Sequence, residues 1–261
     1  MQLSVNGVDT FVATGGRDFD AALPTVVMLH GAGFDSSTWC LQSRWFAHHG
    51  HNVLAPDLPG HGHSAGAALG SIAELADWTA ALIDAAGAKQ ARLVGHSMGS
   101  LIALETAARH PAKVTQLSLL GTSAAMAVGP ELLSNAEAND QAAVDMVSIW
   151  GLGFHAELGG CPMPGLWMHG SAQRVLQATP RGVLFTDLAA CNSYQNALTA
   201  AAQVKIPTTL ILGERDMMTP LKAGKALAAA VPNANTVVLR GAGHMMMIEQ
   251  PDEVLAALQG R

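Results

Sequence analysis

The sequence predicts an α/β protein built on a doubly wound, mostly parallel sheet. Short, continuous apolar runs are typical of strands buried on both faces of such a sheet, and helix signals lie between them. A third observation is a long stretch, 122–206, that has helical patterns and no convincing strand. We therefore expect a core formed by 1–121 and 207–261, with a helical lid at 122–206 inserted between core strands.

The predicted strands follow from simple patterns. Asn6-Gly7 separates two strand-like segments, 3–5 and 10–13, which is typical of a hairpin with a type I′ turn. Six apolar runs follow and alternate with helical segments. They are 25–29, 52–55, 91–94, 116–120, 208–212 and 236–239.

Capping signals predict where three of the connecting helices begin. Ser71 with Glu74 forms a capping box, Thr219 with Pro220 provides a cap and a first-turn proline, and Pro251 opens the last helix. The insertion should lie over the carboxyl ends of the strands, where open α/β sheets bind ligands.

The composition excludes several classes of protein. The net charge is −6, hydrophobic residues make up 49% and charged residues 13%, so a disordered chain or a basic nucleic-acid or membrane-binding surface is not expected. There is no apolar run of about 18 residues, and the first cationic residue is Arg17, which leaves no basic region for a signal peptide. These patterns predict a soluble, cytoplasmic protein.

Metal and disulfide sites are also not expected. The cysteines, Cys40, Cys161 and Cys191, have no metal-ligand spacing. The histidines at 48, 49 and 51 have no acidic or cysteine partner nearby in the sequence. We therefore expect no metal and no organic cofactor.

The G-x-S-x-G pattern occurs twice, and its context separates the two copies. In 95–99 the serine, Ser97, follows a predicted strand and precedes a predicted helix that ends at Pro111. In 62–66 the serine, Ser64, follows a turn cluster with no strand before it. A nucleophile must be exposed on a strand-turn-helix, so Ser97 is the predicted nucleophile and Ser64 an ordinary loop serine.

A serine hydroxyl needs a histidine base and an acid that orients the base. His244 follows the last predicted strand in a glycine-flanked loop, and Asp216 follows the strand before it. Glu214 on the same loop is the competing acid, and Asp187 in the insertion ranks lower. The predicted triad is therefore Ser97, Asp216 and His244.

Backbone amides should stabilise the developing oxyanion. The strand 25–29 runs through His30 into Gly31-Ala32-Gly33, where a chain rich in glycine can approach a substrate closely. The amides of Ala32 and Met98 are the expected donors, and His30 is expected to brace the loop through a hydrogen bond.

Five ordered motifs together resemble a lid-bearing α/β-hydrolase, of the serine esterase or lactonase-like branch, over nearly the whole chain. The motifs are Leu29-His30-Gly31-Ala32-Gly33, Asp57-Leu58-Pro59-Gly60-His61-Gly62-His63-Ser64, Val94-Gly95-His96-Ser97-Met98-Gly99, Gly213-Glu214-Arg215-Asp216 and Gly243-His244. The resemblance implies the same triad and oxyanion positions, and it implies a structural turn at 57–64. A serine at the elbow, in place of aspartate, disfavours the haloalkane dehalogenase and epoxide hydrolase branches.

Methionines and tryptophans are the candidates for the substrate pocket. Met217 and Met245 flank the predicted Asp216 and His244, and Trp150 and Trp167 lie in the insertion. Core or helix packing is the competing interpretation for all four. Between 122 and 204 the only cations are Arg174 and Arg181, against six acidic residues, so the insertion has a net charge of −4 and favours uncharged substrates.

The sequence therefore predicts a serine hydrolase that cleaves a small carboxylic ester, lactone or thioester through an acyl-enzyme. Carbon–carbon bond hydrolysis and cofactor-free perhydrolysis on the same triad remain open, as does a ligand-binding protein without turnover. A homodimer also remains open, whereas nucleic-acid and membrane partners are not expected.

Overall fold

The computed structural model describes residues 1–232 and 234–260, and the strands in these residues form one eight-stranded sheet in the order β1-β2-β4-β3-β5-β6-β7-β8. Asn233 and Arg261, which fall within the predicted core range 207–261, lie outside the described residues. The strands are β1 (Gln2–Val5), β2 (Val8–Ala13), β3 (Thr25–Leu29), β4 (Asn52–Pro56), β5 (Ala91–His96), β6 (Val114–Leu120), β7 (Thr208–Gly213) and β8 (Asn235–Leu239).

The sheet confirms the predicted fold class. β1 pairs antiparallel with β2, and β2 with β4, while the pairs from β4 through β3 to β8 are parallel. Each of the six apolar runs lies within one of the strands β3 to β8. Asn6 and Gly7 have φ angles of 53° and 81°, as a type I′ turn requires.

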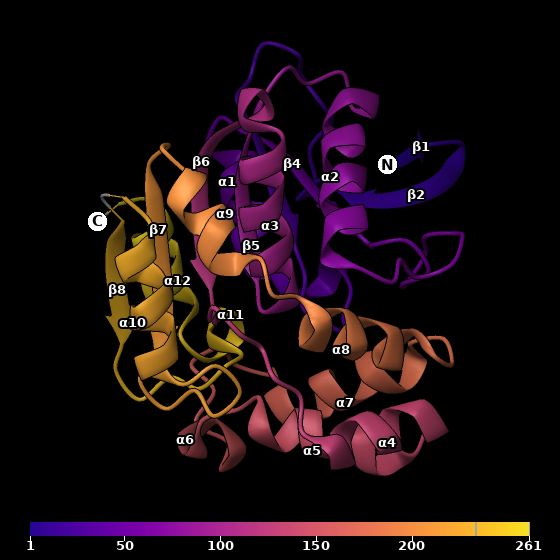
Figure 1. The fold of residues 1–261 in the computed structure, drawn as a ribbon, viewed down its shortest axis with the longest axis vertical. Helices are drawn as coiled ribbons and strands as arrows, with labels where there is room; N and C mark the ends of the chain where they lie inside the picture. Colours follow the sequence, from indigo (N-terminus) through magenta and orange to yellow (C-terminus); the bar gives the residue numbers. More distant parts are fainter. Residues whose placement is uncertain (233, 261) are drawn as a thin grey trace.

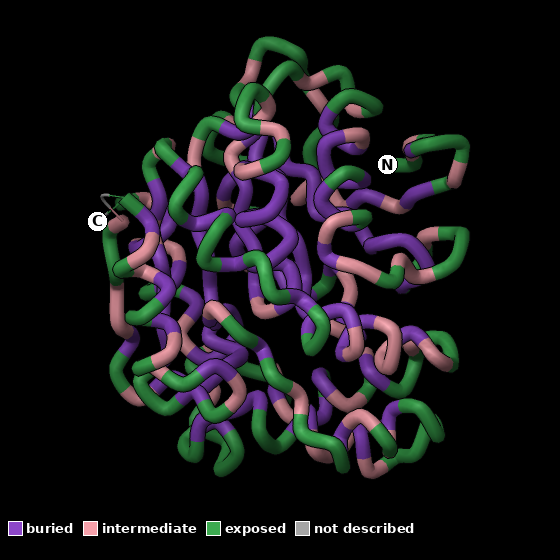
Figure 2. The backbone as a smooth tube through the Cα atoms, viewed as in Figure 1, coloured by how far each residue is buried: buried purple, intermediate pink, exposed green. Residues whose placement is uncertain are grey.

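Alternate residues of the central strands pack against opposite faces of the sheet. In β3, Val27 and Leu29 belong to one apolar cluster, whereas Val26 and Met28 belong to another. Helices α2 (Ile72–Ala85), α3 (Met98–Arg109), α9 (Ala197–Gln203) and α10 (Leu221–Ala230) contribute to the first cluster, and α1 (Cys40–His48), α11 (Met246–Glu249) and α12 (Pro251–Leu258) to the second (Figure 1). The buried residues consequently concentrate along the sheet and the inner faces of these helices (Figure 2).

Two of the three predicted helix starts are confirmed. The Ser71 hydroxyl accepts a hydrogen bond from the Glu74 amide and donates one to its carboxylate, and α12 begins at Pro251. At α10 the predicted threonine cap is wrong, because Pro220 is the N-cap residue and no side chain caps the helix. The Thr219 hydroxyl instead donates to Asp216, at 2.7 Å.

Helices fill the stretch between β6 and β7. They are α4 (Pro130–Ala138), α5 (Gln141–Trp150), α6 (Phe154–Glu157), α7 (Met168–Ala178), α8 (Val183–Ser193) and α9. The first five, which we call the inserted helices, lie beyond one end of the parallel strands, at the bottom of Figure 1. α9 packs on α3 and α10 instead, so this last part of the predicted lid lies in the layer that covers the sheet. Among the described residues, no helix combines the length and the hydrophobicity that crossing a membrane would need.

Candidate active site

Ser97 lies on a sharp turn between β5 and α3, with φ 53° and ψ −121°. This backbone conformation is strained for a residue other than glycine. The turn also brings the two flanking segments into close contact: a side-chain carbon at Gly95 would lie 2.1 Å from the Gly99 carbonyl oxygen, and one at Gly99 would lie 2.3 Å from the Leu29 carbonyl oxygen. Only glycine fits at these two positions, which explains the G-x-S-x-G spacing around Ser97.

Asp216 and His244 form a buried pair at the ends of β7 and β8. The His244 Nδ1 lies 2.8 Å from the Asp216 Oδ2. The other carboxylate oxygen, Oδ1, accepts hydrogen bonds from the Met218 and Thr219 amides, at 2.9 and 2.8 Å. Burial acts to raise the pKa of Asp216, but His244 and the Thr219 donors outweigh it and hold the pKa below its ordinary value. The carboxyl group is therefore ionised and fixed toward the ring.

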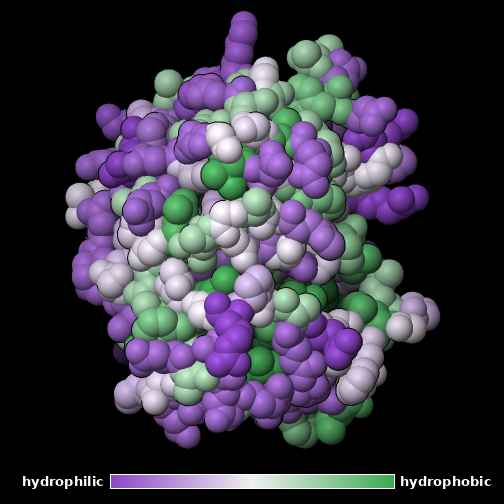
Figure 3. Space-filling view, turned by 90° about the vertical axis from the view of Figure 1, so that its right-hand side faces the viewer, coloured by the Kyte–Doolittle hydropathy of each residue, from purple (hydrophilic) through white to green (hydrophobic). Residues whose placement is uncertain are grey.

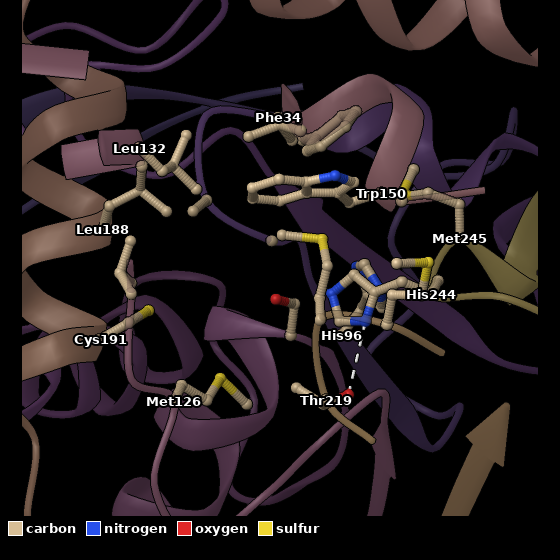
Figure 4. A pocket seen from close by; sticks show the side chains of 18 of the residues that line it. Phe34, His96, Met126, Leu132, Trp150, Leu188, Cys191, Thr219, His244 and Met245 are labelled. Atoms are coloured by element: carbon tan, nitrogen blue, oxygen red, sulfur yellow. Dashed lines mark hydrogen bonds between the residues drawn. The ribbon is translucent and has the colours of Figure 1, made fainter. Parts of the chain in front are cut away.

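The opposite edge of the His244 ring is unpaired. Its Nε2 is buried and has no hydrogen-bond partner among the described residues. Because Nδ1 carries the hydrogen bond to Asp216, Nε2 is the nitrogen free to exchange a proton with a bound group. His244, labelled in Figure 4, lines the same cavity as Ser97.

Two buried residues hold the His244 loop. The His96 Nε2 lies 2.9 Å from the His244 carbonyl oxygen, and burial lowers the pKa of His96 well below its usual value, so a neutral ring donates this bond. The Glu249 Oε2 accepts the Gly243 amide at 2.9 Å and the Gly153 amide at 3.0 Å. Burial raises the pKa of Glu249, although these amide donors act in the opposite direction.

The two residues expected to stabilise an oxyanion, Ala32 and Met98, lie near Ser97. Ala32 lines the cavity. The neighbouring Gly31 approaches the nucleophile closely, since a side-chain carbon there would lie 3.2 Å from the Ser97 Cβ. Met98 is the first residue of α3, where amide groups have no partner within the helix. Amides at these two positions can therefore face the carbonyl oxygen of a group bound at Ser97.

The cavity has a volume of about 160 Å³ and is mainly apolar. Three of the residues that the sequence offers for the substrate pocket line this cavity, namely Met217, Met245 and Trp150. Trp167 does not line it: this residue is 70% exposed, and its ring lies over Gly170, where no side chain obstructs it. The inserted helices add lining residues that the sequence analysis did not assign to the pocket. They are Leu132, Leu188 and Cys191 (Figure 4), together with Val147.

The competing candidates lie apart from the Asp216–His244 pair. The Ser64 hydroxyl accepts the Phe11 amide and donates to the Asp57 carbonyl oxygen, which makes it part of the structural turn. Glu214 accepts the Gly241 amide at the surface. Asp187 is buried and bonded to His61 and Gly33.

Several supporting residues gave no clear signal in the sequence. Glu249 bonds Gly153, which is distant from it in the sequence. Thr219 bonds Asp216, although its position before Pro220 indicated a helix cap. His96 was visible, because it is the variable residue before Ser97, but its contact with the His244 carbonyl depends on the packing of β5 against the last loop. Among the described residues, no cluster of three or more His, Cys, Asp or Glu side chains has the arrangement of a metal site.

Comparisons with known proteins identify similar hydrolases. A pimeloyl-[acyl-carrier protein] methyl ester esterase from Chromobacterium violaceum is 32% identical over 96% of this chain and 97% of its own length. An (E)-2-((N-methylformamido)methylene)succinate hydrolase from Acinetobacter baylyi is 24% identical over 90% of this chain and 88% of its own length. The structure of an enol-lactonase from Burkholderia xenovorans superposes with a TM-score of 0.89 at 24% identity, covering 100% of this chain and 98% of the other. Residues 26–257 match the sequence profile of the alpha/beta hydrolase family. The chain therefore belongs to the alpha/beta hydrolase family.

Proposed function

We propose that this protein is a carboxylesterase that acts through an acyl-enzyme on Ser97. The Ser97 Oγ attacks the ester carbonyl carbon, and its proton passes to the His244 Nε2. The amides of Ala32 and Met98 stabilise the oxyanion, and His244 returns the proton to the leaving alcohol. Water then repeats the sequence on the acyl-enzyme, and Asp216 keeps the ring oriented throughout.

The observation that carries this proposal is the state of His244. Its Nδ1 is bound to an ionised, buried carboxylate, while its Nε2 is unpaired at the cavity that Ser97 also lines. An unpaired buried polar atom lowers stability, so the orphan Nε2 needs an explanation, and proton exchange with the Ser97 hydroxyl at the same cavity supplies one. This arrangement supports a general base that acts on the Ser97 hydroxyl.

The cavity favours an uncharged substrate with a short acyl chain. Among the described residues that line it, no Lys, Arg, Asp or Glu is present. Arg174 and Arg181, the cations of the insertion, are both exposed and lie outside the lining. The volume of about 160 Å³ is below the roughly 300–1,000 Å³ of sites for larger ligands.

The inserted helices act as a lid over this cavity, and 1–121 with 207–261 form the core beneath it. Leu132 on α4, Trp150 on α5 and Leu188 on α8 contribute to the lining of the cavity. On the face shown in Figure 3, hydrophobic residues lie in recesses of the lower half, between hydrophilic residues. The apolar lining of the cavity favours an apolar ester, which would displace water when it binds.

A series of neutral nitrophenyl esters of increasing acyl length tests the proposal. Each buried methylene adds about 0.8 kcal/mol, or about fourfold, so kcat/KM should rise with chain length until the cavity is full and then fall. A nitrophenyl ester with a terminal carboxylate should be a much poorer substrate than its neutral analogue of equal length. Preference for the anionic ester, abolished by Arg174→Ala or Arg181→Ala, would contradict the proposed substrate class.

A cavity variant and its neighbour serve as a matched pair. Leu132→Ala enlarges the cavity and should shift the optimum toward a longer acyl chain, because Leu132 is in the lining. Leu133→Ala removes the same atoms from a partly buried residue that is not in the lining, so the optimum should not move. A single stoichiometric release of nitrophenol without further turnover would indicate a binding protein instead of an enzyme.

A further inference from the structure

Asp187 is buried on α8 with a set of partners that the proposed reaction does not use. Its side chain is 1% exposed, and its Oδ2 lies 2.8 Å from the Gly33 amide nitrogen and 2.8 Å from the His61 Nε2. Gly33 follows Ala32 in the loop after β3, and His61 lies in the turn after β4. A carboxylate of the inserted helices therefore reaches directly into the loop that carries the oxyanion position.

The inserted helices hold both polar groups of Gly33. Its amide donates to Asp187, and its carbonyl oxygen accepts the hydroxyl of Thr179, at 2.6 Å. The side chains of Leu176 and Leu184 lie so close that a side-chain carbon at Gly33 would be 2.9 and 2.8 Å from them. α7, α8 and their connection thus pack against the loop after β3 and hold it in place.

The core holds the other side of Ala32. The Gly31 carbonyl oxygen accepts hydrogen bonds from the His30 Nδ1 at 2.9 Å and from the Phe34 amide at 3.2 Å. The His30 Nε2 accepts the Leu58 amide, so the ring is neutral and donates through Nδ1. In a trans peptide the Ala32 N–H points opposite to the Gly31 carbonyl, so these bonds orient one peptide plane and Asp187 orients the next.

His61 balances the charge of the Asp187 carboxylate that accepts the Gly33 amide. Both His61 nitrogens face acceptors, the Asp187 carboxylate and the Pro59 carbonyl oxygen, so both donate and the ring is cationic. Burial lowers the pKa of His61, but Asp187 and Pro59 outweigh it and raise the pKa above its usual value. The neutralised pair therefore does not repel an oxyanion that forms nearby, while the carboxylate still makes a charge-assisted bond to Gly33.

We propose that Asp187 is a positioning residue that sets the oxyanion hole, holding the Ala32 amide in its productive orientation by accepting the Gly33 N–H. This inference rests on the proposed esterase function. It means that the oxyanion position is complete only when α8 is seated on the loop after β3. The residue that completes it belongs to the insertion, although both expected oxyanion donors belong to the core.

A pair of ketone inhibitors with the acyl chain that the enzyme prefers separates this role from a general structural one. A trifluoromethyl ketone forms a bond between its carbonyl carbon and the Ser97 Oγ, the carbonyl electron pair moves to oxygen, and the serine proton moves to His244. The matching methyl ketone fills the same cavity without that step. Inhibition constants for both are measured with wild type, Asp187→Asn and Asp187→Ala, and with Asp145→Asn as the control.

Asp187→Asn should weaken inhibition by the trifluoromethyl ketone on the order of 10- to 100-fold, less than the roughly 10²–10³-fold loss that follows deletion of an oxyanion donor. Asp187→Ala should weaken it further, and kcat should fall with both variants while KM changes little. The methyl ketone should bind equally well throughout. Asp145, whose carboxylate on α5 accepts only glutamine side chains, should be neutral to substitution.

Other outcomes overturn the inference in distinguishable ways. Equal losses for both ketones, or no loss for either in a folded Asp187→Asn protein, would show that Asp187 only supports the fold. A wild-type protein that neither turns over esters nor binds the trifluoromethyl ketone more tightly than the methyl ketone would instead contradict the esterase proposal itself.

Discussion

At the scale of single residues, the backbone at Ser97 has the conformation that a nucleophile needs at the cost of about 1–3 kcal/mol of strain. Close packing of Gly95 and Gly99 maintains it. Ser64 lies in an identical sequence pattern, yet both of its hydroxyl bonds go to the backbone of the turn. The same five-residue pattern therefore places a hydroxyl at the cavity in one case and a structural bridge between backbone segments in the other.

The role of Asp216 leads to a prediction about two acids on the same loop. Asp216→Asn should fold and lose up to ~10⁴ in kcat, because an amide favours the wrong tautomer of His244. Glu214→Gln is the matched control, and it should leave kcat nearly unchanged, since Glu214 bonds only the Gly241 amide at the surface. Steady-state kinetics on one neutral ester provide the measurement, and the reverse ranking would assign the orienting acid to Glu214.

At the scale of elements, buried carboxylates join the insertion to both parts of the site. Asp187 links α8 to the loop after β3. Glu249 links the segment between α5 and α6 to the loop that carries His244, through the amides of Gly153 and Gly243. Each carboxylate satisfies backbone donors that would otherwise be buried without partners. The loop after β3 therefore depends on α8 for one of its bonds, whereas the start of α6 depends on Glu249 of the core.

The His61–Asp187 contact predicts how stability depends on pH. The folded pKa of His61 is raised, so its stabilising effect is complete below the unfolded value near 6.5 and is lost as the pH rises through the folded pKa. The charged and titratable groups facing His61 are Asp187, Asp57 and His30, and the last has its pKa lowered to about 4 by burial and by His61. His30 therefore stays neutral over this range.

His61→Gln should accordingly lower the free energy of unfolding near pH 6 and flatten its decline toward pH 9. Urea unfolding at a series of pH values measures both effects. His63→Gln provides the control, because His63 lies two residues away and is exposed. If the two variants had the same pH dependence as the wild type, His61 would not be the cationic partner of Asp187.

At the scale of the whole molecule, local patterns in the sequence predict the sheet and the chemistry at its edge. The runs of β3 to β8 are recognisable because strands buried on both faces are continuously apolar. Parallel strands end at one edge of the sheet, so loops after β3, β5, β7 and β8 had to meet there. Contacts between distant segments could not be predicted in this way: Thr219 resembled a helix cap, and Trp167 resembled a pocket residue.

The limit of prediction from the sequence is clearest for the inserted helices. Their apolar positions are visible in the sequence, but the residues that line the cavity and the residues that pack between helices have the same hydrophobic character. Leu132 lines the cavity and Leu133 does not, although the two are adjacent. The position of each helix over the sheet decides between them, and that position is set by tertiary packing, including the bonds to Asp187 and Glu249.

The measurement that tests the central claim most directly is kcat for Ser97→Ala beside Ser64→Ala on a neutral nitrophenyl ester. We expect Ser97→Ala to fold normally and to lose on the order of 10⁶ in kcat, as removal of a triad nucleophile does in a serine protease. Ser64→Ala should unfold more readily, by about 1–2 kcal/mol for its two lost hydrogen bonds, with kcat unchanged. Turnover that survives in Ser97→Ala, or that disappears in a folded Ser64→Ala protein, would contradict the assignment of Ser97 as the nucleophile.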